Sequence, residues 1–278
     1  MPARRYTGAV IVPDSYEAAP AILDEILSIV RTRRGLDFAG YRRGTLERRL
    51  ANRLLAAGEP DARRYLDRLR ASDDEIDRLI EVLTIKVSRF YRNAEVFDAL
   101  RDTLLPELAA RFAPARLRAW SAGCGRGEEA YTLAMLLDEA DGTVDATDID
   151  EAALTAARSG RYAPDAFAEL PPALLRFVRT PPEEPAWSVV PALQRRVHFA
   201  HHDLGGAGRA PGGQRYHLVC CRNVLIYFDA SLQGHANRLL IDSLVPGGLL
   251  CLGEAEWLTE YAAQIEPVDR KLKVFRRR

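Results

Sequence analysis

A glycine-rich loop between two apolar runs is the most restrictive feature of this sequence. The loop G-C-G-R-G of residues 123–127 follows an apolar run over 117–122, and a helical pattern begins directly after it. A second short apolar run ends at Asp148. Strand, glycine loop, helix, strand and acid is the layout of a nucleotide-binding βαβ unit. Because glycines let the backbone approach a ligand closely and a helix N-terminus offers N–H groups, we expect an adenosine-containing cofactor here.

Acidic residues beside this loop indicate which cofactor fits. Glu128 and Glu129 follow the loop directly, and their carboxylates suit a ligand with an ammonium and a sulfonium group. Asp148 stands where it can accept hydrogen bonds from two ribose hydroxyls. A second interpretation is that the glutamates favour the first turn of a helix and that Asp148 caps its strand. Asp150 is expected to be the N-cap of a helix over 151–158.

The end of the sequence favours S-adenosylmethionine over a dinucleotide. A P-G-G-x-L-x-L segment begins at Pro246, and residues 271–275 are expected to close the chain as an antiparallel hairpin strand. This sheet ending is typical of class I methyltransferases, and no second dinucleotide-binding half is recognisable in the sequence. We therefore expect S-adenosylmethionine as the cofactor and S-adenosylhomocysteine as the product.

Hydrophobic patterning divides the chain into a helical part and an α/β part. Residues 1–20 are rich in proline and small residues, and we expect a flexible arm there. Residues 21–105 show helical spacing, which predicts an all-helical N-terminal domain. Residues 106–278 alternate strand and helix patterns, which predicts a class I, Rossmann-like methyltransferase sheet. A proline-rich insertion at about 164–196 interrupts this alternation and is expected to form a small β subdomain.

Composition argues against several classes of function. The formal net charge is zero, so no global field attracts nucleic acid or an anionic membrane. No apolar run approaches the roughly 20 residues of a membrane-spanning helix. The cysteines form no C-x-x-C pair, and the H-H-D sequence of residues 201–203 has no further ligands at metal-site spacing. We expect a cytoplasmic monomer with no metal, no nucleic-acid partner and no membrane insertion.

Several segments of the chain carry a family resemblance. In order they are Y-R-R-G-T-L-E-R-R-L-A-N-R-L, L-T-I-K-V-S-R-F-Y-R, W-S-A-G-C-G-R-G-E-E-A-Y-T, A-T-D-I-D and C-C-R-N-V-L-I-Y-F-D. Together they resemble the chemotaxis receptor methyltransferases of the CheR type, over most of the chain. The resemblance implies methyl transfer from S-adenosylmethionine to glutamate side chains of chemoreceptors, in sensory adaptation. The implied partners are the cytoplasmic helices of chemoreceptors, with their acidic methylation region.

The resemblance also implies roles around the cofactor. Glu129, with Glu128 beside it, would hold the amino end of the methionine part, and Asp148 would hold the ribose. The remaining positions that would contact the cofactor are Lys86, Ser88, Arg92, Gly123, Asp203, Leu204, Asn223 and Val224. The pair Asp203–Leu204 would lie beside the adenine. The family usually has asparagine at the place of Lys86, where a lysine either attracts the acceptor carboxylate or points to solvent.

The expected chemistry needs little from the protein beyond alignment. A glutamate carboxylate is already ionised near pH 7, so it can attack a sulfonium methyl group without a general base. Arg92 would orient the incoming carboxylate through charge-assisted hydrogen bonds, and Tyr227 would donate a hydrogen bond to it. The alternatives are a surface or interdomain ion pair for Arg92 and a core position for Tyr227.

Residues 41–70 are the candidate docking segment. They contain nine arginines and four acidic residues, and Arg42, Arg49 and Arg53 have the spacing to share one helical face. A basic helix would dock an acidic receptor helix and steer its association. The alternatives are a solvated arginine-rich helix and nucleic-acid binding, although the interleaved aromatic residues of a base-stacking surface are missing.

Two other functions fit parts of the pattern. A methyltransferase for nucleic acid or a small molecule would usually carry a D/N-P-P-Y/F-like motif after the fourth strand, whereas this sequence has R-N-V-L at 222–225. A non-catalytic, cofactor-binding sensor or scaffold in a chemosensory array is the other alternative, and Lys86 is the residue that favours it.

Overall fold

The computed structural model describes residues 20–59, 61–84, 88–181, 185–206, 208–258, 261 and 263–278. The chain forms two compact units that divide between Ile85 and Lys86, so the division lies earlier than the predicted boundary at residue 105. The reason is that the helices after Ile85 pack in the same unit as the sheet, which helical spacing alone cannot reveal. The predicted arm lies outside the described residues, except Pro20, and so does Lys86.

The first unit is helical. Its helices are α1 (Pro20–Arg34), α2 (Arg43–Ala57), α3 (Ala62–Ala71) and α4 (Asp73–Leu83). Apolar side chains of these helices form its core, and the buried ones include Ile26 and Val30 in α1, Leu46, Leu50 and Leu54 in α2, and Ile76, Leu79, Ile80 and Leu83 in α4. Asp61 begins α3 by accepting hydrogen bonds from two backbone N–H groups, as an N-cap residue does.

The second unit is built on a seven-stranded sheet in the order β6-β2-β1-β7-β8-β10-β9. The strands are β1 (Arg118–Ala122), β2 (Thr143–Asp148), β6 (Val197–His201), β7 (Tyr216–Cys221), β8 (Leu244–Leu252), β9 (Ile265–Asp269) and β10 (Val274–Arg277). β1, β2, β6, β7 and β8 run parallel, while β10 pairs antiparallel with both β8 and β9. The predicted terminal hairpin strand is thereby confirmed.

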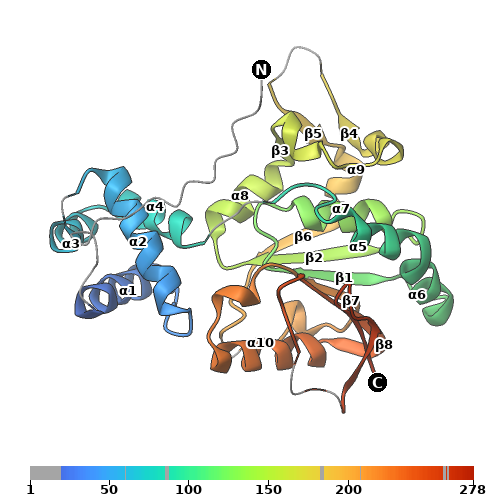
Figure 1. Cartoon of the computed structure of the whole chain (residues 1–278). Helices are drawn as coiled ribbons and strands as arrows, with labels where there is room; N and C mark the ends of the chain where they lie inside the picture. Colours follow the sequence, from blue (N-terminus) through green and yellow to red (C-terminus); the bar gives the residue numbers. More distant parts are fainter. Residues whose placement is uncertain are drawn as a thin grey trace. The chain divides into compact units, whose positions relative to one another are not determined.

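Helices cover both faces of this sheet (Figure 1). α7 (Glu128–Leu136) packs on β1 and β2, α8 (Glu151–Ser159) on β2 and β6, and α10 (Ala230–Asp242) on β8, across the sheet from α7. The segment before β1 forms α5 (Ala94–Ala99), the π-helix η2 (Leu100–Leu104) and α6 (Leu105–Phe112). The strands of the sheet centre are buried on both sides, as parallel strands between helices are.

The proline-rich insertion contributes two strands to a second, three-stranded sheet in the order β3-β5-β4, and β3 lies just before the predicted start of the insertion at residue 164. Its strands are β3 (Arg161–Tyr162), β4 (Val178–Arg179) and β5 (Trp187–Val189). The short helices of this region are η3 (Pro164–Phe167), η4 (Pro172–Phe177) and α9 (Pro191–Gln194). Two further short turns, η5 (Pro211–Gly213) and η6 (Leu225–Tyr227), flank β7. This small sheet is separate from the seven-stranded sheet.

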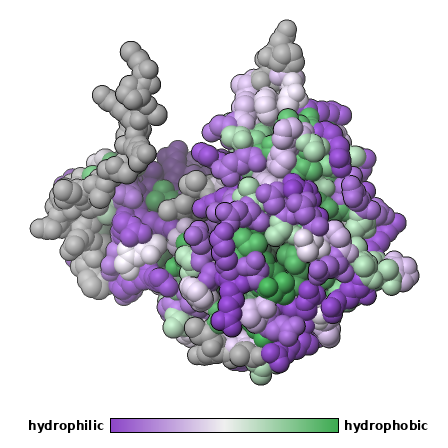
Figure 2. Space-filling view, turned by 45° about the vertical axis from the view of Figure 1, so that its right-hand side comes forward, coloured by the Kyte–Doolittle hydropathy of each residue, from purple (hydrophilic) through white to green (hydrophobic). Residues whose placement is uncertain are grey.

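Hydrophilic residues cover most of the face drawn in Figure 2, and hydrophobic residues are exposed there only in limited areas. Such a surface is ordinary for a globular chain, because polar side chains cannot cover it completely. Among the residues that the structure describes, no helix has the length and apolar character required to cross a membrane.

Candidate cofactor and methyl-transfer site

The parallel strands bring the predicted cofactor residues to one edge of the sheet. Gly123 follows β1, Asp148 ends β2, Asp203 follows β6 and Asn223 follows β7. Because these strands run parallel, their carboxyl ends lie at the same edge. Ligands of open α/β sheets bind at this edge, beside the strand where the order reverses. That strand is β1, whose neighbours are β2 and β7.

The glycine loop after β1 is pressed against the loop after β7. Gly123 has φ +77°, and a Cβ added there would lie 2.4 Å from Cγ2 of Val224. Any other residue would therefore be strained and would push Val224 aside. Gly127, with φ +93°, stands at the N-cap position of α7. The glycines thus allow two loops to meet closely beside the N-terminus of a helix.

Glu128 and Glu129 begin α7 in different surroundings. Glu129 accepts a hydrogen bond from Oγ of Ser121 at 2.8 Å, and its other oxygen lies 3.4 Å from Nη1 of Arg222. Glu128 is 5% exposed, and no described residue donates a hydrogen bond to its Oε2. Burial raises the pKa of Glu128 above its ordinary value. Oε2 of Glu128 is thus buried without a donor, and a contact of Glu128 with the ammonium group of a ligand stays a prediction.

Asp148 holds the glycine loop itself. Its carboxylate accepts hydrogen bonds from N–H of Gly125 at 2.8 Å and from N–H of Asp150 at 3.0 Å. The capping interpretation of Asp148 is therefore confirmed, while its contact with ribose stays a prediction. Asp150 accepts from N–H of Ala153 at 3.1 Å, which confirms it as the N-cap of α8.

The loop after β6 approaches the end of β2. The backbone N–H of His202 donates to the carbonyl oxygen of Asp148 at 3.1 Å. Asp203 accepts a hydrogen bond from N–H of Gly205 at 2.7 Å, and Leu204 is buried. His202, which directly precedes Asp203 and Leu204, thus holds this loop at the end of β2, and their contact with adenine stays a prediction.

The segment before α5 reaches the same edge. Phe90 stacks on Phe167 with ring centroids 4.2 Å apart, and N–H of Tyr91 donates to Oγ1 of Thr132 on α7 at 3.1 Å. Arg92 is half-buried beside them, and its carbonyl oxygen accepts a hydrogen bond from Nη2 of Arg222. Ser88 is also half-buried. Tyr227 ends η6 and is half-buried, four residues beyond Asn223.

Two residues of this edge were not singled out from the sequence. Arg222 follows β7 and joins Glu129 to the Arg92–Asn93 turn. Glu256 is 3% exposed and accepts hydrogen bonds from N–H groups of Gly253 and of residues 223–225, at 2.6–3.2 Å. Burial raises the pKa of Glu256, against the opposing effect of these N–H donors. The available signal was the pair of acids Glu254 and Glu256 just after β8 and Gly253, and the sequence does not tell which of the two is buried.

The prediction of a docking face on α2 is wrong for Arg49 and Arg53, two of the three arginines assigned to it. Arg49 is 3% exposed and donates a hydrogen bond to the carbonyl oxygen of Leu83 at the end of α4. Arg53 makes two hydrogen bonds of 2.7 Å to the buried carboxylate of Glu75. Both therefore stabilise the helical unit from its inside, and only Arg42 of the three is exposed. The spacing placed Arg49 and Arg53 on one side of α2, but that side is the packed one.

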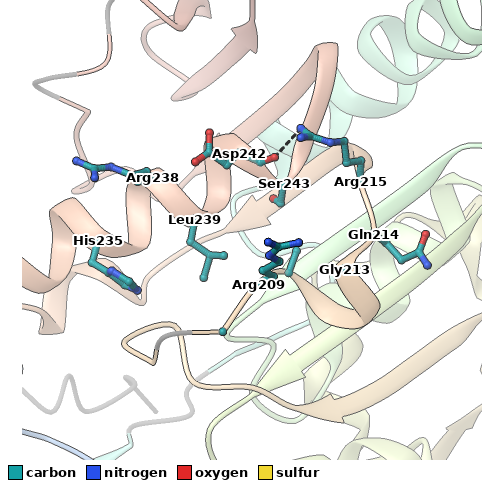
Figure 3. A pocket seen from close by; sticks show the side chains of 11 residues that line it. Arg209, Gly213, Gln214, Arg215, His235, Arg238, Leu239, Asp242 and Ser243 are labelled. Atoms are coloured by element: carbon teal, nitrogen blue, oxygen red, sulfur yellow. Dashed lines mark hydrogen bonds between the residues drawn. The ribbon is translucent and has the colours of Figure 1, made fainter.

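A separate pocket of about 500 Å³ lies against α10, and none of the predicted site residues is among those that line it (Figure 3). Its charged lining includes Arg209, Arg215, Arg238 and Asp242. Arg215 donates to the backbone carbonyl of Asp242 at 2.8 Å, and Arg238 points away from the hollow. Among the described residues, no cluster of His, Cys, Asp and Glu side chains has the make-up of a metal site.

Both units of the chain match known protein families. Residues 86–274 match the family CheR methyltransferase, SAM binding domain, and residues 21–84 match CheR methyltransferase, all-alpha domain. The chain is 32% identical to the chemotaxis protein methyltransferase of Listeria monocytogenes, over 82% of this chain and 87% of that one. It is 34% identical to that of Escherichia coli K12, over 83% of this chain and 82% of that one.

Two other similarities are less informative. An uncharacterized 104.1 kDa protein of Rhodobacter capsulatus is 34% identical over 89% of this chain, but the match spans only 26% of that protein. The solved glycopeptide N-methyltransferase MtfA complexed with S-adenosylmethionine is 18% identical, with a TM-score of 0.34 over 63% of this chain and 66% of that one. The assignment rests on the two matched domains: the chain belongs to the CheR methyltransferase family, and its second unit is an S-adenosylmethionine-binding domain.

Proposed function

We propose that the protein transfers the methyl group of S-adenosylmethionine to glutamate side chains of chemoreceptors. The observation that carries this proposal is the pair Glu128–Glu129 at the carboxyl edge, beside the glycine loop, in a chain whose relatives are named chemotaxis protein methyltransferases. The acceptor glutamates would lie on cytoplasmic receptor helices, so the protein would act in the cytoplasm.

The reaction balances without a protein base. An acceptor carboxylate oxygen forms the new O–C bond while the C–S bond breaks, and the sulfur keeps the electron pair. When bound, S-adenosylmethionine supplies the methyl group and the leaving sulfur. The protein's part is to align these groups and to exclude water, and such alignment can supply roughly 7–11 kcal/mol of the barrier in favourable cases. The products are a glutamate methyl ester and S-adenosylhomocysteine.

The proposed roles follow the positions at the carboxyl edge. Glu128 and Glu129 would bind the ammonium group, and Asp148 would accept hydrogen bonds from the ribose. Arg92 and Tyr227 would orient the acceptor carboxylate. The residues proposed to line the remainder of the site are Ser88, Gly123, Asp203, Leu204, Asn223 and Val224. Lys86 stays a predicted contact outside the described residues.

The test is a transfer assay with a methyl-labelled cofactor and a purified cytoplasmic fragment of a chemoreceptor. We expect label on the fragment that is released as methanol by mild alkali, as a methyl ester requires. A fragment with its acceptor glutamates replaced by alanine is the matched control. Cofactor binding without label on any receptor fragment would instead support a non-catalytic sensor.

Cofactor affinity should rise with pH in the weakly acidic range. Burial raises the pKa of Glu128 above its ordinary value of 4.5 in the free protein, and a bound ammonium group would lower it again. Binding therefore favours the ionised carboxylate and releases a proton, so affinity falls as the pH falls through the raised pKa. Each unit of pKa change corresponds to about tenfold in affinity. Calorimetry from pH 5 to 8 measures this, and Glu128→Gln should flatten the profile.

We infer that exposed arginines of the helical unit attract the acidic receptor helix. Arg48 on α2 and Arg64 on α3 are exposed. The double charge reversal Arg48→Glu/Arg64→Glu should weaken binding of a receptor fragment by about 3- to 10-fold at low salt. The effect should shrink at 0.5 M salt, because screening shortens the reach of exposed charges.

The matched control is Arg195→Glu, which makes the same charge change at an exposed residue of the second unit. Binding is measured by fluorescence anisotropy of a labelled receptor fragment. Equal weakening by the control, or a loss that does not depend on salt, would remove the helical unit from the docking surface.

A further inference from the structure

One buried guanidinium connects the cofactor side of the site with the acceptor side. The side chain of Arg222 is 4% exposed. Its Nη1 lies 3.4 Å from Oε2 of Glu129, while its Nη2 donates to the carbonyl oxygen of Arg92 at 3.1 Å and to Oδ1 of Asn93 at 2.8 Å. The guanidinium carbon stands 5.1 Å from the centre of the Phe97 ring. Arg222 thus contacts α7 and the turn before α5 at the same time.

The turn that Arg222 holds adopts an unfavourable backbone. Tyr91 has φ 61° and Asn93 has φ 63°, both in the left-handed region that residues other than glycine rarely occupy. Such conformations persist only when the surroundings fix them. On one side N–H of Tyr91 bonds to Thr132, which lies on α7 one turn beyond Glu129. On the other side the fixing contacts come from Arg222.

The backbone of Arg222 is held rigidly because of where the residue lies in the chain. It follows β7 directly, and β7 pairs with β1 and β8 in the centre of the sheet. The strand therefore fixes the Cα of Arg222, and the Phe97 ring supports its planar end. Burial acts to lower the pKa of the Arg222 guanidinium, while the nearby carboxylate of Glu129 acts to raise it. The resulting pKa lies above the ordinary value of an arginine. The residue remains a cation throughout the working pH range.

We propose that Arg222 is a positioning residue that fixes Arg92 relative to Glu129, so that its loss slows methyl transfer without weakening cofactor binding. The inference rests on the proposed function, in which Glu129 holds the cofactor and Arg92 orients the acceptor. Arg222 couples these two tasks through the backbone of the turn.

Loss of Arg222 should affect cofactor binding and methyl transfer differently, because Arg222 and the ammonium group of the cofactor compete for the carboxylate of Glu129. Without the guanidinium, the carboxylate keeps its hydrogen bond from Ser121 and meets the ammonium of the cofactor with less competition. Cofactor affinity should therefore stay equal or increase. The turn, in contrast, would lose two of its fixing bonds, and a misplacement of about 1 Å can reduce the rate about 100-fold.

The experiment compares Arg222→Lys and Arg222→Gln with the full-length wild type. We expect kcat to fall about 10- to 100-fold in both. The Kd for S-adenosylhomocysteine should change less than threefold for the lysine variant, which keeps a cation near Glu129. It should be equal or lower for the glutamine variant. Thermal unfolding checks that each variant is folded, and a merely structural role would weaken cofactor binding together with kcat.

A second pair of variants isolates the turn. Asn93→Gly removes one of the two acceptors for Nη2 of Arg222 while keeping the left-handed φ accessible, whereas Asn93→Asp keeps an acceptor oxygen there. We expect kcat to fall about tenfold for Asn93→Gly and to stay near the wild-type value for Asn93→Asp. Arg238→Gln, at an exposed arginine of α10, is the control for loss of a cation.

The outcomes separate this inference from the proposed function. A wild-type protein that transfers no methyl group to the receptor fragment contradicts the proposed function. With an active wild type, unchanged kcat in the folded Arg222→Lys variant overturns the inference, and so does a Kd more than tenfold weaker. If the wild type is inactive, the Kd values decide: a lower Kd for S-adenosylhomocysteine in the Arg222→Gln variant supports the competition for Glu129, and a higher Kd overturns it.

Discussion

Replacing Glu75 by alanine should destabilise the helical unit by about 3–5 kcal/mol. The Glu75 side chain is 1% exposed and accepts two hydrogen bonds of 2.7 Å from Arg53 and one of 2.8 Å from the Tyr65 hydroxyl. The substitution would leave a largely buried guanidinium without this carboxylate. Urea unfolding followed by circular dichroism measures the loss in the free energy of unfolding.

Two variants show whether burial is the cause. Glu47→Ala removes an exposed ion pair with Arg43, also within this unit, and should cost about 0.5 kcal/mol or less. The double variant Arg53→Met/Glu75→Leu removes both buried charges and should recover much of the stability lost in the single variant. A loss below about 1 kcal/mol for Glu75→Ala would contradict this account of the helical unit.

Replacing Glu256 by alanine should weaken cofactor binding by about 10- to 100-fold. The carboxylate accepts hydrogen bonds from four backbone N–H groups, three of them in residues 223–225. Each buried donor left without a partner costs about 1–3 kcal/mol, so the loop should rearrange. Asn223 has φ 62° and Val224 touches Gly123, so the rearrangement would disturb both loops at the carboxyl edge.

Calorimetry with S-adenosylhomocysteine measures this effect. Glu254→Ala is the matched control, since Glu254 lies two residues earlier and is exposed. Thermal unfolding shows whether the Glu256 variant remains folded. Wild-type affinity in a folded Glu256→Ala protein would mean that the loop keeps its shape without the carboxylate.

Much of the fold is local in origin and was therefore predictable. The glycine loop, the helix after it and the acid that ends β2 lie within a short stretch, and the pattern of apolar residues identifies each element. The N-cap Asp150 and the terminal hairpin were also correctly predicted, because both depend on residues near in sequence. The division between the units was placed too late, since helical spacing does not show which core a helix joins.

The site was predicted in outline, and its supporting contacts were not. Arg222 lies 93 positions from Glu129 along the chain, and Glu256 lies 31–33 positions from the loop residues that it holds. Such distant pairings leave no periodic trace in a single sequence. The same reason explains the error on α2, where spacing alone could not tell a packed arginine face from an exposed one.

By itself, the sequence determined the class of the chain: a parallel nucleotide-binding sheet, its acidic cofactor edge and a resemblance to receptor methyltransferases. These follow from local geometry, because a strand, a glycine turn and a helix each depend on neighbouring residues. Only the tertiary structure decided which charges are buried and what they join, as for Arg53 with Glu75 and Arg222 with Glu129. Burial and long-range pairing arise when distant segments exclude water between them, and that happens only in the folded chain.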